Sequence, residues 1–337
     1  MNPGKVHHGS TSTNIIMHPN GTANNNRNEE KEEKKVEITH LPDDIFRQIH
    51  EFISIDTNLL LVNRHFHAMK GRLHCYKFTK KHSLEYYAFK AFRERVHETV
   101  SDVSQQLSLD LSSSSYITDV SSLGGVHALN LSDCDMITDV SAFGGVHTLD
   151  LSRCSKITDV SMLGGVHTLK LSGCSKITDV SALGGVHTLN LSRCSKITDI
   201  SMLGGVHTLN LSNCDQISDV SFLGGVHTLR LSHCNKITDV SMLGGVHTLN
   251  LYNCTEITDV SMLGGVHTLH LWNCHKITDV SMLGRIHTLH LNGCSSITDV
   301  SMLGSVVDLV LPSHFYDNDG VTSESSSDDS DDFINYL

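Results

Sequence analysis

The chain has 337 residues, of which 39% are hydrophobic and 18% charged, and its formal net charge is −12 at neutral pH. This composition allows a packed core, but the negative charge argues against a broad nucleic-acid surface, because binding phosphate groups requires clustered Lys and Arg. No apolar run is long enough for a membrane span or a secretory signal. We therefore expect a cytoplasmic protein, with the nucleus as the alternative, that binds neither nucleic acid nor membranes.

Residues 1–36 are rich in Asn, Ser, Glu and Lys and end in NNNRNEEKEEKK. A segment of this composition buries too little apolar surface to offset the entropy lost when the chain is ordered. We predict that residues 1–36 are disordered.

Apolar residues return with helical spacing in residues 37–80, in the stretch LPDDIFRQIHEFISIDTNLLLVNRHFH. Pro42 suits the first turn of a helix, and two aspartates follow it there. Asp56 can cap a second helix. The pattern predicts a helical hairpin.

This hairpin resembles the F-box, whose pattern begins with Leu-Pro, continues with an Ile/Leu/Phe face and an Asp, and closes with Val-x-Arg-x-aromatic. The resemblance implies that residues 37–80 bind a Skp-type adaptor of a cullin-based ubiquitin ligase. The matching contact residues are Leu41, Pro42, Ile45, Ile49, Phe52, Leu59, Val62 and Phe66. The chain departs from the family at Phe66, where Trp is common, and in a less recognisable third helix after Gly71. The alternative is that this segment is only a helical cap.

Residues 81–105 contain the amphipathic stretch SLEYYAFKAFRERV at 83–96. We predict that this stretch is a linking helix that covers the first unit of the domain that follows it.

From residue 106 to residue 311 the chain repeats a twenty-residue unit, for example VHTLKLSGCSKITDVSALGG at 166–185. A period of this length indicates a solenoid. The apolar positions match the leucine-rich-repeat frame L-x-x-L-x-L-x-x-N/C-x-L, and the unit resembles the short repeats of internalins. A degenerate first unit and a last strand ending at Pro312 are expected to close the two ends.

Within each unit, Leu169 and Leu171 alternate with polar residues and predict a strand whose leucines point inward. The remainder is too short for a full α-helix, which favours a 3₁₀ or single-turn segment begun by Asp179. Gly184 and Gly185 are expected to supply positive φ, and only the first, present in all ten copies, to be sterically required. The predicted fold is an α/β solenoid, a leucine-rich-repeat horseshoe or arc with a parallel sheet on the concave face and 3₁₀ segments on the convex face.

Two further columns carry potentially reactive side chains. Nine cysteines, from Cys134 to Cys294, recur every twenty residues and are expected to be reduced, inward-facing packing groups, since CxxC pairs are absent. Nine histidines, from His127 to His287, are expected to form a ladder at the strand edge in which crowding disfavours protonation. We predict no metal site and no cofactor.

Three columns on or beside the concave face vary between copies while the others stay constant. Drift of exposed positions is one explanation. The other is recognition of a target protein, because paired exposed aromatics are typical anchors of protein interfaces. The target-binding residues predicted on this basis are Lys170, Arg230, Tyr252, His270, Trp272 and His290.

The two resemblances together imply the substrate-recognition subunit of a Skp–cullin–F-box ubiquitin ligase, with the F-box on the adaptor and the repeats on an unknown target. The sequence has no phosphate loop, nucleophile elbow or HExxH pair, so we expect no catalytic activity. The alternative is a leucine-rich-repeat scaffold or enzyme regulator without a ligase role. Residues 312–337, which include SESSSDDSDD, are predicted to be an acidic disordered tail.

Overall fold

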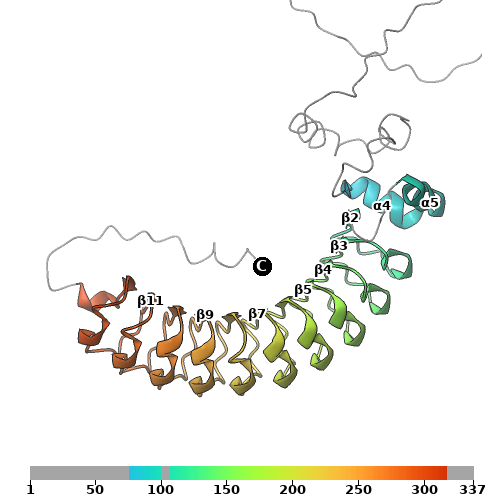
Figure 1. Cartoon of the computed structure of the whole chain (residues 1–337). Coiled ribbons are helices and arrows are strands. Elements are labelled where there is room, and N and C mark those ends of the chain that lie inside the picture. The colour runs from blue at the N-terminus through green and yellow to red at the C-terminus, as the bar shows by residue number, and fades with distance from the viewer. Residues whose placement is uncertain (1–75, 100–106, 317–337) are drawn as a thin grey trace, which may run out of the picture. The chain divides into compact units, whose positions relative to one another are not determined.

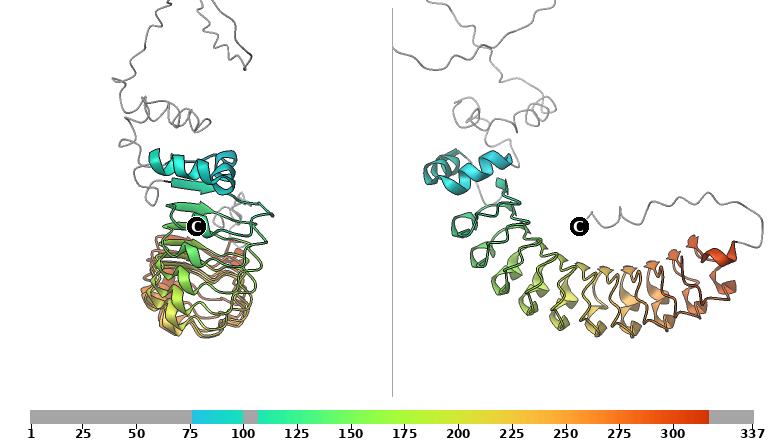
Figure 2. Two further views of the ribbon diagram at one scale, coloured as in Figure 1. Left: turned by 90° about the vertical axis from the view of Figure 1, so that its right-hand side faces the viewer. Right: turned by 180° about the vertical axis from the view of Figure 1, so that it is seen from behind.

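The computed structural model describes residues 76–99 and 107–316. In these residues twelve parallel strands form one sheet, in which each strand is hydrogen-bonded to the next in chain order. The strands from β2 onward line the concave side of an arc, and 3₁₀ helices line its convex side (Figures 1 and 2). The predicted leucine-rich-repeat arc is confirmed.

The elements repeat with the sequence. The strands are β1 (Tyr76–Lys77), β2 (Leu107–Asp110), β3 (Ala128–Asn130), β4 (Thr148–Asp150), β5 (Thr168–Lys170), β6 (Thr188–Asn190), β7 (Thr208–Asn210), β8 (Thr228–Arg230), β9 (Thr248–Asn250), β10 (Thr268–His270), β11 (Thr288–His290) and β12 (Asp308–Val310). The 3₁₀ helices are η1 (Ser121–Leu123), η2 (Ser141–Phe143), η3 (Ser161–Gly165), η4 (Ser181–Gly185), η5 (Ser201–Gly205), η6 (Ser221–Leu223), η7 (Ser241–Gly245), η8 (Ser261–Gly265), η9 (Ser281–Leu283), η10 (Ser301–Leu303) and η11 (Ser313–Phe315). Among the described residues, the α-helices that precede β2 are α4 (Lys80–Ala88) and α5 (Lys90–Thr99).

Each coil buries the same apolar set. Leu169 pairs in register with Leu189 of the next strand, so equivalent residues stack directly on one another. In the coil that starts at β5 the fully buried side chains are Leu169, Leu171, Cys174, Ile177, Leu183 and Val186. The core is therefore a continuous apolar column that no single coil could form alone.

As predicted, the carboxylate of Asp179 binds the backbone at the start of the 3₁₀ helix. Its Oδ1 accepts a hydrogen bond of 2.9 Å from the backbone N–H of Ser181, and the equivalent bond recurs in the other coils. This bond satisfies a donor that the start of a helix leaves free.

The prediction that Gly184 and Gly185 adopt positive φ is wrong. Gly184 and Gly185 both lie within the 3₁₀ helix η4. Positive φ occurs instead just after each strand, at 60° in Asp133, 74° in Gly173 and 61° in Asn213. Because Asn, Asp and Gly tolerate this conformation best, one of the three variable columns is constrained by the backbone turn.

The expectation that only the first glycine is sterically required holds for the pair Gly184 and Gly185, for a different reason, but not in every coil. A Cβ added to Gly184 would overlap the carbonyl oxygen of Met202 in the next coil. A Cβ at Gly185 would lie 3.2 Å from the carbonyl oxygen of Gly164, which is tight but open to small adjustment. In a later coil both positions are restricted, because a Cβ at Gly264 or at Gly265 would lie 2.6 Å from a carbonyl oxygen of a neighbouring coil.

The first coil offers a matched test of this contact. Gly124→Ala should lower the free energy of unfolding by about 1–3 kcal/mol, because the new methyl group meets the backbone of Ala142. Gly125→Ala should have little effect, since nothing lies within 4 Å of its added Cβ. Urea titrations followed by circular dichroism compare the two variants, and equal losses would disprove the contact.

The N-terminal end of the arc is closed by β1, α4 and α5. β1 pairs with β2, and Phe78, Tyr86, Phe92 and Val96 are buried in the same core as the repeats. The backbone N–H of Asp110 donates to Ser83 Oγ at 3.0 Å. The single helix expected at 83–96 is interrupted at Phe89, where φ is −116° and ψ is 108°.

The C-terminal end folds onto the last coil through the first residues of the predicted tail. Leu311 N–H donates to the hydroxyl of Tyr316 at 3.1 Å, and His314 Nε2 lies 2.8 Å from the carbonyl oxygen of Ile297. The F-box-like residues Leu41 to Phe66, the segment 1–36 and the tail from residue 317 lie outside the described residues. In the part of the chain that is described, no helix has the length and apolar character needed to cross a membrane.

Candidate functional site

The concave face is built from the third residue of each strand and from the residue two positions later. Both positions flank a buried leucine, so their side chains leave the core on the concave side. The six predicted target-binding residues all lie here and are half-buried. Lys170, Arg230, His270 and His290 end strands β5, β8, β10 and β11, whereas Tyr252 and Trp272 follow β9 and β10.

Asn and Asp in the strand-end column have a structural role that sequence reasoning missed. The Oδ1 atom of Asn190 accepts a hydrogen bond of 3.0 Å from the backbone N–H of Ser192. The same bond is formed by Asp110, Asn130, Asp150, Asn210 and Asn250. The signal was present in the sequence, because side chains of this type characteristically bond the backbone two residues onward.

Lys170 and Arg230 occupy the same strand-end column but differ from Asn and Asp. Their side chains have no acceptor atom and cannot form the turn bond that Asn or Asp provides. The turn bond therefore does not account for the cation found in these two coils. This favours a role for the cations on the concave surface.

Five rings from neighbouring coils form one contiguous group, which we term the aromatic cluster: His233, Tyr252, His270, Trp272 and His290. The Tyr252 and Trp272 rings meet edge to face at 6.2 Å, and His233 meets Tyr252 edge to face at 4.9 Å. Trp272 stacks on His290 with ring centroids 5.8 Å apart and planes 19° apart. The structure therefore brings together four of the six predicted residues and adds His233.

Lys170 lies outside this group. The sheet places β6 and β7 between β5, which carries Lys170, and β8, which carries Arg230. Arg230 is close enough to the cluster to act electrostatically on His270. The concave surface thus has one compact patch bordered by Arg230 and a separate lysine nearer the N-terminus.

His270, in the middle of the aromatic cluster, is uncharged at neutral pH. Burial first, and then electrostatic interaction with His290 and Arg230, lower the pKa of His270 to about 4, whereas Asp308 acts in the opposite direction. The two imidazoles approach closely, with 3.2 Å between Nδ1 of His270 and Nδ1 of His290. His290 Nε2 lies 3.6 Å from Asp308 Oδ2. His270 is therefore neutral at pH 7 and lies within electrostatic reach of both Arg230 and Asp308.

Trp272 carries a buried polar atom that is not satisfied. Its Nε1 is buried and has no hydrogen-bond partner among the described residues. A buried donor without an acceptor costs about 1–3 kcal/mol. A shift of the indole that offered Nε1 to an outside acceptor would recover this free energy.

No protein-family model matches the chain, and no curated protein sequence matches it. The chain has a leucine-rich-repeat fold. Among solved structures, internalin InlF from Listeria monocytogenes is 20% identical over 65% of this chain and 81% of that chain, with a TM-score of 0.42. The functional domain of InlJ from the same organism, which includes a cysteine ladder, is 19% identical over 66% and 60%, with a TM-score of 0.39. The leucine-rich repeat domain of the type III effector XopL is 15% identical over 83% and 98%, with a TM-score of 0.41. These similarities concern the fold alone.

The cysteine column is internal to the fold. All nine cysteines from Cys134 to Cys294 are buried with free thiols, as predicted. Each Sγ donates to a leucine carbonyl of the preceding coil, for example Cys154 to Leu131 at 3.1 Å. Burial raises the pKa of Cys154 to about 12, so its reactive thiolate form is suppressed. These thiols act as packing groups that tie one coil to the next.

The predicted histidine ladder is confirmed. From His127 to His287 the rings stack with centroids 4.6 to 4.7 Å apart and nearly parallel planes. From His147 onward, each Nδ1 lies 3.2 to 3.3 Å from the hydroxyl of the following threonine. Nitrogens on parallel rings do not converge on one shared ion. No group of three or more His, Cys, Asp or Glu suited to a metal occurs in residues 76–99 and 107–316.

The ladder makes stability depend on pH. Partial burial and then the charge of neighbouring rings lower the pKa of His147, His187 and His247. A histidine whose pKa is lowered in the folded state binds more protons when unfolded, so its contribution is complete above about pH 6.5 and is lost as the pH falls below that value. We expect the thermal midpoint to fall between pH 7 and pH 5. His187→Gln should lessen this fall, and an unchanged midpoint over that interval would contradict it.

Proposed function

We propose that the protein is a non-catalytic interaction platform that binds a protein partner on the C-terminal half of the concave sheet. The observation that carries the proposal is the aromatic cluster, in which Tyr252 and Trp272 replace the serine found in the equivalent position of seven earlier coils. A few residues supply most of the binding free energy in protein interfaces, and Trp and Tyr are enriched among them.

The N-terminal half of the concave face is less suited to binding a partner than the aromatic cluster. In this half the same columns hold Ser, Asn and Asp, apart from Lys170, and the Asn and Asp side chains are engaged in turn bonds. Such a surface offers little apolar area to a partner. The favoured partner presents an apolar group to Tyr252 and Trp272 and an acidic group to Arg230.

A capture experiment tests the proposal. The intact chain and the double variant Tyr252→Ser with Trp272→Ser are compared by proximity labelling, because serine restores the residue common to the column without changing the fold. Partners of the concave site should be lost from the variant and retained by the matched control Ser132→Ala with Ser152→Ala. Identical partner sets for all three chains would reject the site.

For the N-terminal segment we propose the finer role that the F-box resemblance implies, a substrate-recognition subunit of a Skp–cullin–F-box ubiquitin ligase in the cytoplasm or nucleus. Its support is the sequence pattern from Leu41 to Phe66. The alternative is a scaffold or enzyme regulator without a ligase role. Co-purification with a Skp-type adaptor distinguishes the two. Leu41→Ala with Pro42→Ala should abolish adaptor capture, while the Trp272→Ser variant should retain it. If the Leu41/Pro42 variant still captures the adaptor, the ligase role is rejected and the scaffold or regulator without a ligase role is favoured.

A further inference from the structure

An apolar row crosses the convex side of the arc, opposite the proposed partner site. In the 3₁₀ helices from η3 to η10 the residue before the buried leucine is exposed, and in six successive coils it is large and apolar. We term this row the methionine stripe: Met202, Phe222, Met242, Met262, Met282 and Met302. These side chains are 53 to 63% exposed.

The stripe runs over six adjacent coils, whose backbones approach one another closely at this position. The carbonyl oxygen of Met282 would lie 2.6 Å from a Cβ on Gly264 of the preceding coil, and the other members of the stripe stand in the same relation to their preceding glycines. Toward the N-terminus the column is broken by Ala142 and Ala182, which leave Met162 isolated. Exposed apolar patches of this kind mark sites of interaction in soluble proteins.

A row of carboxylates runs beside the stripe, one per coil, three residues before each member: Asp199, Asp219, Asp239, Asp259, Asp279 and Asp299. Each is exposed, and each Oδ1 is held by the backbone N–H that begins the following 3₁₀ helix, at 2.8 to 3.0 Å. These hydrogen bonds lower the aspartate pKa values, so the row is ionised at neutral pH.

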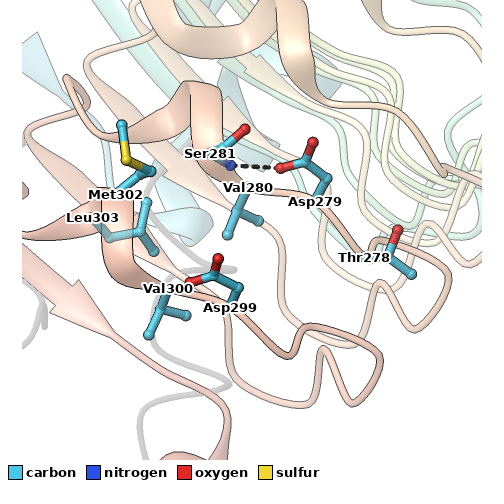
Figure 3. A pocket seen from close by; sticks show the side chains of 8 residues that line it. All are labelled: Thr278, Asp279, Val280, Ser281, Asp299, Val300, Met302 and Leu303. Atoms are coloured by element: carbon cyan, nitrogen blue, oxygen red, sulfur yellow. Dashed lines mark hydrogen bonds between the residues drawn. The ribbon is translucent and has the colours of Figure 1, made fainter.

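The two rows share one surface at the C-terminal end. Asp279, Asp299 and Met302 line a common open pocket of about 350 Å³, floored by Val280, Val300 and Leu303 (Figure 3). In the described part of these coils, two lysines are engaged with other groups. Lys276 Nζ is paired with Glu256 at 2.6 Å, and Lys236 Nζ donates to Gln216 at 2.7 Å.

We propose that the methionine stripe and its aspartate row form a second docking surface, which binds a basic amphipathic segment of a partner protein. Methionine side chains are unbranched and polarisable and adapt to varied apolar partners. The carboxylates select an apolar face flanked by Lys or Arg and steer it onto the stripe. The same carboxylates disfavour an anionic lipid surface, and they disfavour a second copy of this chain, which would present an identical acidic row.

The test uses the full chain and a synthetic 18-residue helical peptide of Leu and Lys, titrated by calorimetry. The variant Met242→Gln with Met262→Gln and Met282→Gln should bind the peptide at least tenfold more weakly, whereas Met162→Gln should bind it normally. Asp239→Asn with Asp259→Asn and Asp279→Asn keeps the acceptor that begins each 3₁₀ helix. It should weaken binding and reduce its dependence on salt.

The methionine variant also isolates the stripe from the acidic tail, because it leaves every charge in place. Binding unchanged in that variant would put the peptide on other acidic residues and overturn the proposal. A Leu/Glu peptide bound as tightly as the Leu/Lys peptide would overturn the choice of a basic partner. Self-association in the ultracentrifuge that disappears in the methionine variant would show that a second copy of the chain occupies the stripe. Stripe-dependent binding to phosphatidylcholine vesicles in place of the peptide would show that a lipid surface occupies it. Trp272→Ser should leave peptide affinity unchanged, which separates this surface from the concave one.

Discussion

Leu171→Ala should lower the free energy of unfolding by about 2–5 kcal/mol. Leu171 is fully buried, and its counterparts Leu151 and Leu191 are buried in the neighbouring coils. Its backbone N–H also donates to the carbonyl oxygen of Asn190 at 2.8 Å, so the backbone there is held in place. The cavity left by the lost methyl groups has little freedom to collapse.

The next strand position provides the control. Lys170→Ala removes a half-buried side chain from the concave surface and should change stability by less than Leu171→Ala. Urea titration measures both variants, and hydrogen exchange shows how far the damage extends. Because each coil contacts mainly its neighbours, loss of protection should be greatest in the coils beside Leu171. Equal losses for the two variants would mean that the strand faces the other way.

Periodicity made most of the fold predictable. A column that repeats every twenty residues must occupy one place on every coil, so the inward leucines, the buried cysteines and the histidine ladder followed from spacing alone. The short β1 and the break at Phe89 did not, because neither belongs to the repeat. The role of Gly184 was misassigned because steric contact between coils and positive φ both require glycine, and sequence does not distinguish them.

The site was predicted only in part for a related reason. Variation between copies was interpreted as recognition, yet Asn and Asp after the strand satisfy a turn, and Asn190 and its equivalents bond the backbone. The preference of the turn column for Asn, Asp and Gly was hard to recognise, because three coils carry Arg153, Arg193 and His233 there with positive φ. What turn chemistry leaves unexplained is a smaller set, which contains Lys170, Arg230 and the aromatic cluster.

Trp272→Ser should weaken partner binding by about 2 kcal/mol or more, as the loss of a central aromatic anchor commonly does. The effect on folding should be small. The ring is half-buried and keeps an unsatisfied Nε1, so removing it relieves a cost at the same time as it loses contacts with Tyr252 and His290. Affinity for the partner captured by proximity labelling, measured by calorimetry alongside a thermal melt, separates the two effects.

Variants on the same face should rank by their distance from the cluster. Tyr252→Ser should resemble Trp272→Ser, whereas Arg230→Glu should weaken binding in a salt-dependent manner if it meets an acidic group. Asn130→Ala, at the polar end of the sheet, should bind normally. If Trp272→Ser binds as tightly as the unaltered chain while Ser181→Arg on the convex side abolishes binding, this partner is held by the convex face. The aromatic cluster would then serve only to pack the last coils together.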